Sequence, residues 1–133
     1  MRSLQMTQAQ LFSMHKQAQV EEPKEACGLL AGKDGIVTMV IPVQNIAAAK
    51  TKFQMDPRAQ LRAMELIDIE KLELLGIYHS HPKGPSYPSA TDLRENQYQV
   101  IHVICSKAGR KWMSKAFELD QYNFVEVPLD LRG

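Results

Sequence analysis

The sequence predicts one domain of the α/β (α+β) class, in which a mixed β-sheet is sandwiched by helices. Apolar and β-branched runs, which are typical of strands, alternate along the 133-residue chain with segments of helical periodicity. The length is that of one ordinary domain, and 44% hydrophobic with 23% charged residues is the composition of a folded globular protein. We therefore expect residues 1–133 to form a single domain.

Composition and charge argue against several classes of protein. Sixteen Lys and Arg against fifteen Asp and Glu leave a formal charge of +1, which gives no reason to expect binding to nucleic acid or to an anionic membrane. The apolar runs are far shorter than the ~20 residues that span a bilayer, and the N-terminus lacks the apolar segment of a signal peptide. Two cysteines outside any CxxC pair argue against a disulfide framework. These features favour a cytoplasmic protein.

Three helices are expected from their start and stop signals. Thr7 is a candidate N-cap for the first, which ends at Glu22-Pro23 because the residue before a proline avoids helical backbone angles. Asp56-Pro57 opens the second helix, expected over residues 57–73. Ser89 or Thr91 caps a short third helix that extends to about residue 97.

Strands are expected where short apolar or β-branched runs lie between turn residues. They cover residues 26–31, 36–43, 52–55, 74–81, 100–106, 111–118 and 123–127. Residues 82–88 cannot continue the fourth of these strands, because three prolines in seven residues remove backbone donors. This order of helices and strands implies a mixed sheet with helices packed on its faces.

The most informative stretch surrounds His79 and His81. Two residues apart on a strand, they point to the same face, so both imidazoles can converge on one ion. Asp92 lies eleven residues after His81, where the proline-rich loop can return it to the strand end. Three such ligands leave a fourth tetrahedral position for water, which marks catalytic rather than structural zinc. Ser89 is a candidate donor to an oxyanion, whereas spacing alone does not choose among the carboxylates that could act as a base.

This stretch resembles the signature of a known family. His79-Ser80-His81, then seven residues, Ser89, two residues and Asp92 matches the JAMM/MPN (Mov34/PAD-1-like) zinc metallopeptidases. Residues 23–32 look like the family's glutamate-bearing strand entry, and residues 53–57 look like the segment that leads into its central helix. The resemblance implies a sheet sandwiched by helices and related in shape to cytidine deaminases.

The resemblance also implies roles for individual residues. His79, His81 and Asp92 would bind one Zn²⁺, Glu25 would be the general base, and Ser89 would hydrogen-bond the oxyanion. The implied reaction is zinc-dependent hydrolysis of a peptide or isopeptide bond after the C-terminal tail of a ubiquitin-like or sulfur-carrier protein, with a zinc-activated water as nucleophile. The short connections match the compact prokaryotic type and leave no room for the insertions of larger members, so we do not expect linkage-selective deubiquitination.

Substrate contacts are predicted on both sides of this site. Residues 52–55 and 83–87 are candidate walls for an extended tail that binds by strand addition, with Phe53 and Tyr87 as contacts. Cys27 would share a strand face with Glu25 and is a third candidate, although a buried thiol is the simpler interpretation. His102 is most simply a hydrogen-bonded histidine of the sheet. A homodimer that accepts residues 129–133 of a neighbouring subunit is left open.

Other functions fit the sequence less well. A non-catalytic scaffold of the same fold, binding a ubiquitin-like protein, is the main alternative, and the five polar residues of the motif argue against it. A zinc deaminase needs His-x-Glu and Pro-Cys-x-x-Cys, neither of which occurs. A HExxH metalloprotease is excluded by the absence of that string, and a serine hydrolase lacks a nucleophile elbow.

Overall fold

The structure, a computed structural model, describes residues 2–133. Its strands form one eight-stranded sheet in the order β7-β6-β5-β4-β2-β3-β1-β8. The strands are β1 (Leu4–Thr7), β2 (Cys27–Lys33), β3 (Ile36–Val43), β4 (Glu73–His81), β5 (Ile101–Ala108), β6 (Lys111–Leu119), β7 (Phe124–Val127) and β8 (Leu129–Arg132). Strands β4 and β5 are parallel, as is β1 to both β3 and β8, whereas the remaining neighbours are antiparallel. The predicted mixed sheet is confirmed.

Within residues 2–133, three helices accompany the sheet: α1 (Gln8–Glu21), α2 (Pro57–Ile69) and α3 (Ala90–Arg94). The Thr7 hydroxyl accepts the Gln10 N–H while the Gln10 side chain accepts the Thr7 N–H, which forms a capping box at the start of α1. Asp56 caps α2, with Pro57 at its first position. Ser89, one of the two candidate caps, caps α3, so each of these helices begins where the sequence predicts it.

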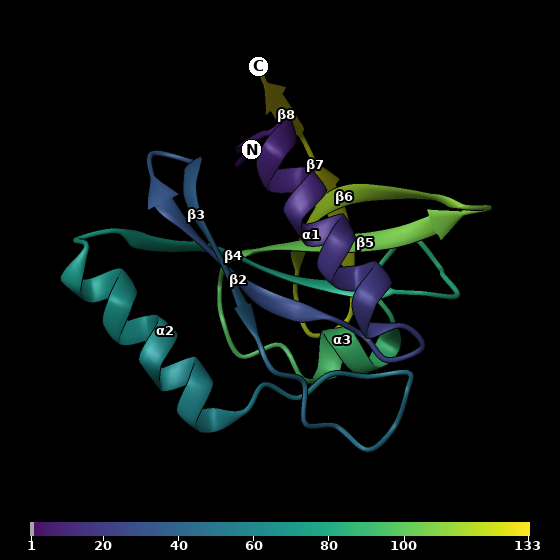
Figure 1. Cartoon of the computed structure of the whole chain (residues 1–133). Coiled ribbons are helices and arrows are strands. Elements are labelled where there is room, and N and C mark those ends of the chain that lie inside the picture. The colour runs from purple at the N-terminus through teal and green to yellow at the C-terminus, as the bar shows by residue number, and fades with distance from the viewer. Residues whose placement is uncertain (1) are drawn as a thin grey trace.

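The helices cover opposite faces of the sheet. On β2 and β4 successive side chains alternate between two cores, so Leu30 and Tyr78 pack with α1 while Leu29 and Ile77 pack with α2. Figure 1 shows α1 crossing β5 and β6, which it contacts, with α2 well separated from it. The predicted arrangement of a sheet between helices is confirmed. The alternation of side chains along each strand determines which residues face α2.

The strand predicted at residues 52–55 is wrong. Only Met55 pairs there, through an isolated bridge to Asn45, and the main chain on either side of Phe53 bonds to the Asn45 side chain instead of to a neighbouring strand. The second helix ends at Ile69 rather than at residue 73, and Lys71 shortly after it has a φ of 57°, outside the right-handed helical region. Helix α3 ends at Arg94, three residues earlier than expected.

Two strands were not predicted. The register pairs Leu4 of β1 with Leu129 of β8, so the last residues of the chain form a strand of the sheet. Both strands have four residues, too few for a clear period of two. Among residues 2–133, no helix combines the length and the apolar character needed to cross a bilayer.

Candidate metal centre

His79 and His81 lie at the end of β4, in the middle of the sheet. The registers place Cys27 of β2 beside His79 on one side and Ile104 of β5 on the other. The histidines are 0% and 5% exposed, respectively. Because residues two apart share a strand face, both imidazoles lie on the α2 side of the sheet.

Asp92 completes a compact group of three donor atoms. The Nε2 atoms of His79 and His81 are 3.0 Å apart, and Asp92 Oδ2 is 3.1 Å from the first and 3.2 Å from the second. Zinc bound tetrahedrally at about 2.0–2.1 Å requires donor atoms about 3.3 Å apart. These three atoms, the donor triangle, therefore lie at nearly the distances from one another that three ligands of a tetrahedral zinc ion require.

The hydrogen bonds of the imidazole rings bear on whether a metal fits. His81 Nδ1 lies 2.8 Å from the Pro85 carbonyl oxygen, which can only accept, so Nδ1 carries a proton. In the neutral ring Nε2 then holds the lone pair that a metal needs, whereas in the protonated ring Nε2 donates to Asp92. His79 Nδ1 is buried and has no hydrogen-bond partner among the described residues. Two imidazole nitrogens and a carboxylate are a donor set that suits zinc. The residues present fit a metal ion of this class.

Glu25 lies directly beside these ligands. Glu25, His79 and His81 offer ligand atoms that lie within 4.8 Å of one another, and all three residues are buried. The position of Glu25 is set by its neighbour Ala26, whose N–H donates to Ser80 Oγ and whose carbonyl accepts the Ser80 N–H. Glu25 Oε1 has no hydrogen-bond partner among the described residues. The carboxylate is thus held next to the donor triangle with an oxygen free for other partners.

The environment shifts the pKa values of Glu25 and Asp92 in opposite directions. Burial raises the pKa of Glu25 to about 7. Burial also opposes the ionisation of Asp92, but hydrogen bonds with His79 and His81 outweigh it and hold the pKa of Asp92 well below its usual range. One group is therefore a constant anion, and the other can exchange a proton near neutral pH.

Ser89 positions Asp92 through a second capping box. The Ser89 hydroxyl accepts the Asp92 N–H at 3.1 Å, and the Ser89 N–H donates to Asp92 Oδ2 at 2.8 Å. Because the hydroxyl oxygen only accepts in this pair, its own proton remains available to another acceptor. The cap of the short helix α3 and the third donor of the triangle are thus one local structure.

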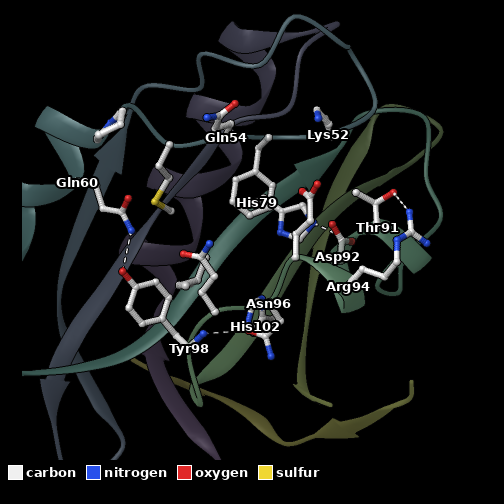
Figure 2. Close-up of a pocket in the computed structure, with 16 residues that line it drawn as sticks. Lys52, Gln54, Gln60, His79, Thr91, Asp92, Arg94, Asn96, Tyr98 and His102 are labelled. Carbon is white, nitrogen blue, oxygen red and sulfur yellow. Dashed lines mark hydrogen bonds and ion pairs between the residues drawn. The ribbon is translucent and has the colours of Figure 1, made fainter. Parts of the chain in front are cut away.

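A pocket of about 630 Å³ opens beside His79 and Asp92. Phe53 forms part of its wall and stacks on the His79 ring, with ring centroids 4.5 Å apart. Figure 2 shows polar side chains around the cavity, including the hydrogen-bonded pair Gln60 and Tyr98. The pocket therefore adjoins two of the three residues of the donor triangle, His79 and Asp92.

The other two predicted contacts lie apart from this pocket. Tyr87 is 50% exposed and stacks on Phe124, in a second hollow between the proline-rich loop and β6–β7. Cys27 is buried, and its thiol donates to the Val43 carbonyl at 3.3 Å. Burial raises the pKa of this thiol to about 12, so at neutral pH it packs as a small apolar group.

His102 also lines the pocket, a position that the sequence did not predict. Its Nε2 lies 2.9 Å from Asn96 Oδ1, its Nδ1 is buried without a partner among the described residues, and it contributes to the pocket lining. Burial lowers its pKa to about 4, so the ring is neutral at pH 7. The period of two places His102 on one face with Ile104, but only the pairing of β5 with β4 brings that face beside His79.

Comparison with known proteins decides the family. The profile described as "Prokaryotic homologs of the JAB domain" (Prok-JAB) matches residues 7–119, which include the whole of the donor triangle, Glu25 and Ser89. The chain belongs to the Prok-JAB family.

The curated relatives of this Prok-JAB chain include proteins named as a protease, a desampylase and a peptidase. It is 44% identical over 90 residues to "Probable TtuB-protein conjugate cleaving protease" of Thermus thermophilus, a match that covers 67% of the chain and 60% of the relative. It is 37% identical to "Desampylase" of Pyrococcus furiosus, covering 76% of the chain and 71% of that protein. It is 38% identical to "CysO-cysteine peptidase" of Mycobacterium tuberculosis, covering 69% and 64%. The match thus spans only about three fifths to seven tenths of these relatives.

Solved structures share the fold over almost the whole chain. A solution structure of a protein from Desulfitobacterium hafniense has a TM-score of 0.86 and 35% identity, covering 99% of this chain and 93% of that one. A crystal structure of a JAB1/MPN domain protein from Archaeoglobus fulgidus has a TM-score of 0.61 and 19% identity, covering 98% and 97%. The resemblance in fold inferred from the motif is confirmed.

Proposed function

We propose that this Prok-JAB chain is a zinc-dependent hydrolase that cleaves a peptide or isopeptide bond after the C-terminal tail of a ubiquitin-like or sulfur-carrier protein. The observation that carries the proposal is the donor triangle of His79, His81 and Asp92, with sides of 3.0–3.2 Å and the Glu25 carboxylate beside it. The peptidase and protease names of the relatives support hydrolysis.

In the proposed reaction the two histidines and Asp92 hold one Zn²⁺. When bound, zinc supplies an activated water and polarises the scissile carbonyl. Glu25 accepts a proton from the attacking water and delivers it to the leaving nitrogen, a role that suits a carboxyl group with a pKa of about 7. Asp92, an anion throughout the neutral range, takes no part in the proton transfer.

The Ser89 hydroxyl stabilises the negative charge that develops on the carbonyl oxygen. Its oxygen already accepts the Asp92 N–H, and this bond limits the directions in which the hydroxyl proton can point. A donor held in place before the reaction costs no reorganisation during it, which is the reason such groups contribute strongly to rate.

The substrate proposal rests on the shape of the site. The pocket beside His79 lies between the segment that carries Phe53 and the stretch that includes Thr91 and Tyr98. A flexible, extended tail suits a site between two such walls. The relatives named for TtuB-protein conjugates and for CysO-cysteine support a protein tail as the substrate.

The test uses fusions of ubiquitin-fold sulfur-carrier proteins to a short peptide, incubated with the full chain and analysed by mass spectrometry. We expect one cut directly after the C-terminal residue of the carrier protein, its loss with a chelator, and its return with Zn²⁺. Cleavage at other positions, or cleavage that persists in the chelator, would contradict the proposal. Diubiquitins of different linkage serve as comparison substrates, and we expect their cleavage rates to differ little from one linkage to another.

A further inference from the structure

The side chain of Asn45 joins two parts of the site that are far apart in the sequence. Its Nδ2 donates to the Glu25 carbonyl at 2.8 Å and to the Lys52 carbonyl at 3.3 Å. Its Oδ1 accepts the N–H groups of Ala47 and Gln54, both at 2.9 Å. The amide thus uses both of its donors and both lone pairs of its oxygen.

The orientation of this amide is fixed by its partners. Backbone N–H groups can only donate and carbonyl oxygens can only accept, so the oxygen must face Ala47 and Gln54 while the nitrogen faces Glu25 and Lys52. A flipped amide would bring donor to donor and acceptor to acceptor at all four contacts. The asymmetry of the side chain is therefore required at this position.

Glu25 and the segment of residues 47–54, which Asn45 joins, both contribute side chains next to the donor triangle. On one side the Glu25 carboxylate lies beside His79 and His81. On the other side the segment of residues 47–54 carries Phe53, which stacks on the His79 ring. Apart from the bonds of Asn45, two backbone hydrogen bonds join the ends of this segment: Ile46 N–H donates to the Gln54 carbonyl, and Asp56 N–H donates to the Gln44 carbonyl. Neither bond involves Glu25.

We propose that Asn45 is a positioning residue that fixes the Glu25 main chain to the segment that carries Phe53. The bond holds the Glu25 carboxylate and the Phe53 ring at a constant distance from each other, beside His79. The inference rests on the proposed function in assigning Glu25 the role of base. It adds a residue outside the zinc-ligand motif, and it links the wall that the substrate touches to the group that transfers the proton.

Two variants separate the two halves of the amide. Asn45→Asp keeps an oxygen for Ala47 and Gln54 but sets a second oxygen against the Glu25 and Lys52 carbonyls. The link to Glu25 is therefore broken, while the segment that carries Phe53 keeps its bond through Gln54. Asn45→Ala breaks both halves and adds no charge. Gln10→Ala is the matched control, because Gln10 is also half-buried and hydrogen-bonded on both sides of its amide, to Thr7 and to Val37, at the opposite face of the sheet.

Steady-state kinetics on the carrier fusion gives the first readout, with zinc content measured for every variant. We expect kcat to fall at least about tenfold in both Asn45 variants at full zinc content, with KM within about threefold of wild type in Asn45→Asp and raised further in Asn45→Ala. The Gln10→Ala variant should lose stability while kcat per folded molecule stays within about twofold. Wild-type kcat in Asn45→Asp, or an equal loss in Gln10→Ala, would overturn the proposal.

Amide hydrogen exchange, measured on the folded variants, gives a second readout that does not depend on hydrolysis. In Asn45→Asp the Ala47 and Gln54 amides should stay protected while the Ala26 amide, next to Glu25, exchanges at least about tenfold faster. In Asn45→Ala all three should exchange faster. Unchanged exchange at Ala26 in both variants would overturn the inference even if the wild-type chain cleaves its substrate. An inactive wild type with the expected exchange pattern would instead contradict only the proposed function.

Discussion

The aromatic ring of Phe53 stacks on the imidazole of His79, with centroids 4.5 Å apart and 29° between the ring planes. The contact joins a segment without regular secondary structure to a histidine that is 0% exposed in the central strand β4. One face of the His79 ring is thereby closed by an apolar group. The ring edge that carries Nε2 still faces His81 and Asp92.

Phe53→Ala should weaken substrate binding more than it weakens the metal site. If the ring also contacts the substrate tail, its loss removes about 1 kcal/mol of apolar contact with the tail. We therefore expect KM to rise roughly fivefold, with kcat and zinc content changed by less than about threefold. Phe12→Ala, which removes an exposed ring from α1, is the matched control and should change neither constant. An unchanged KM in Phe53→Ala would remove the support for this residue as a substrate contact.

Substitutions at Ser89 separate its capping role from its proposed role as a donor. Ser89→Ala removes both and should cost about 1 kcal/mol of stability and about 10²-fold or more in kcat. Ser89→Gly removes the hydroxyl but costs only a few tenths of a kcal/mol as a cap, so kcat should fall equally while urea unfolding remains close to wild type. Ser89→Thr, which keeps both functions, is the control. A kcat near the wild-type value in Ser89→Gly would exclude a donor role.

The buried Glu25 carboxyl should make the metal-free chain less stable as the pH rises. Its folded pKa is about 7 and its ordinary value is 4.5, so the unfolded chain loses this proton first. Stability is therefore lost between pH 4.5 and pH 7, and above pH 7 the full cost of about 3 kcal/mol applies. Below pH 4.5 both states are protonated and the cost vanishes.

Glu25→Gln should accordingly stabilise the metal-free chain by up to about 3 kcal/mol at pH 8 and by almost nothing at pH 4. Urea unfolding in the presence of a chelator measures this difference. Glu65→Gln, at an exposed position of α2, is the control for a general charge effect. An equal effect of Glu25→Gln at both pH values would show that the burial of its charge is not the cause.

Local patterns predicted the parts of the fold that depend on a few neighbouring residues. The N-caps Thr7 and Asp56 and the strand face shared by His79 and His81 follow from side-chain chemistry and from the period of two. The proline-rich residues 82–88 end β4 as expected, and the loop returns Asp92 to the histidines.

The remaining features depend on which strands become neighbours, which a single sequence does not specify. Strands β1 and β8 are neighbours in the sheet although almost the whole chain separates them in the sequence. His102 reaches the pocket only because β5 lies parallel to β4. The segment of residues 52–55 has the composition of a strand, but the Asn45 side chain takes the hydrogen bonds that a neighbouring strand would have made. The single-domain organisation and a homodimer remain predictions.

The most direct test of the account measures zinc content and hydrolysis together in Glu25→Ala. If Glu25 is the base beside a site held by His79, His81 and Asp92, this variant should bind one zinc ion per chain, as the wild type does, while kcat on the carrier fusion falls at least about 10³-fold. His81→Ala is the comparison and should lose both zinc and activity. Hydrolysis at the wild-type rate by zinc-loaded Glu25→Ala would contradict the account.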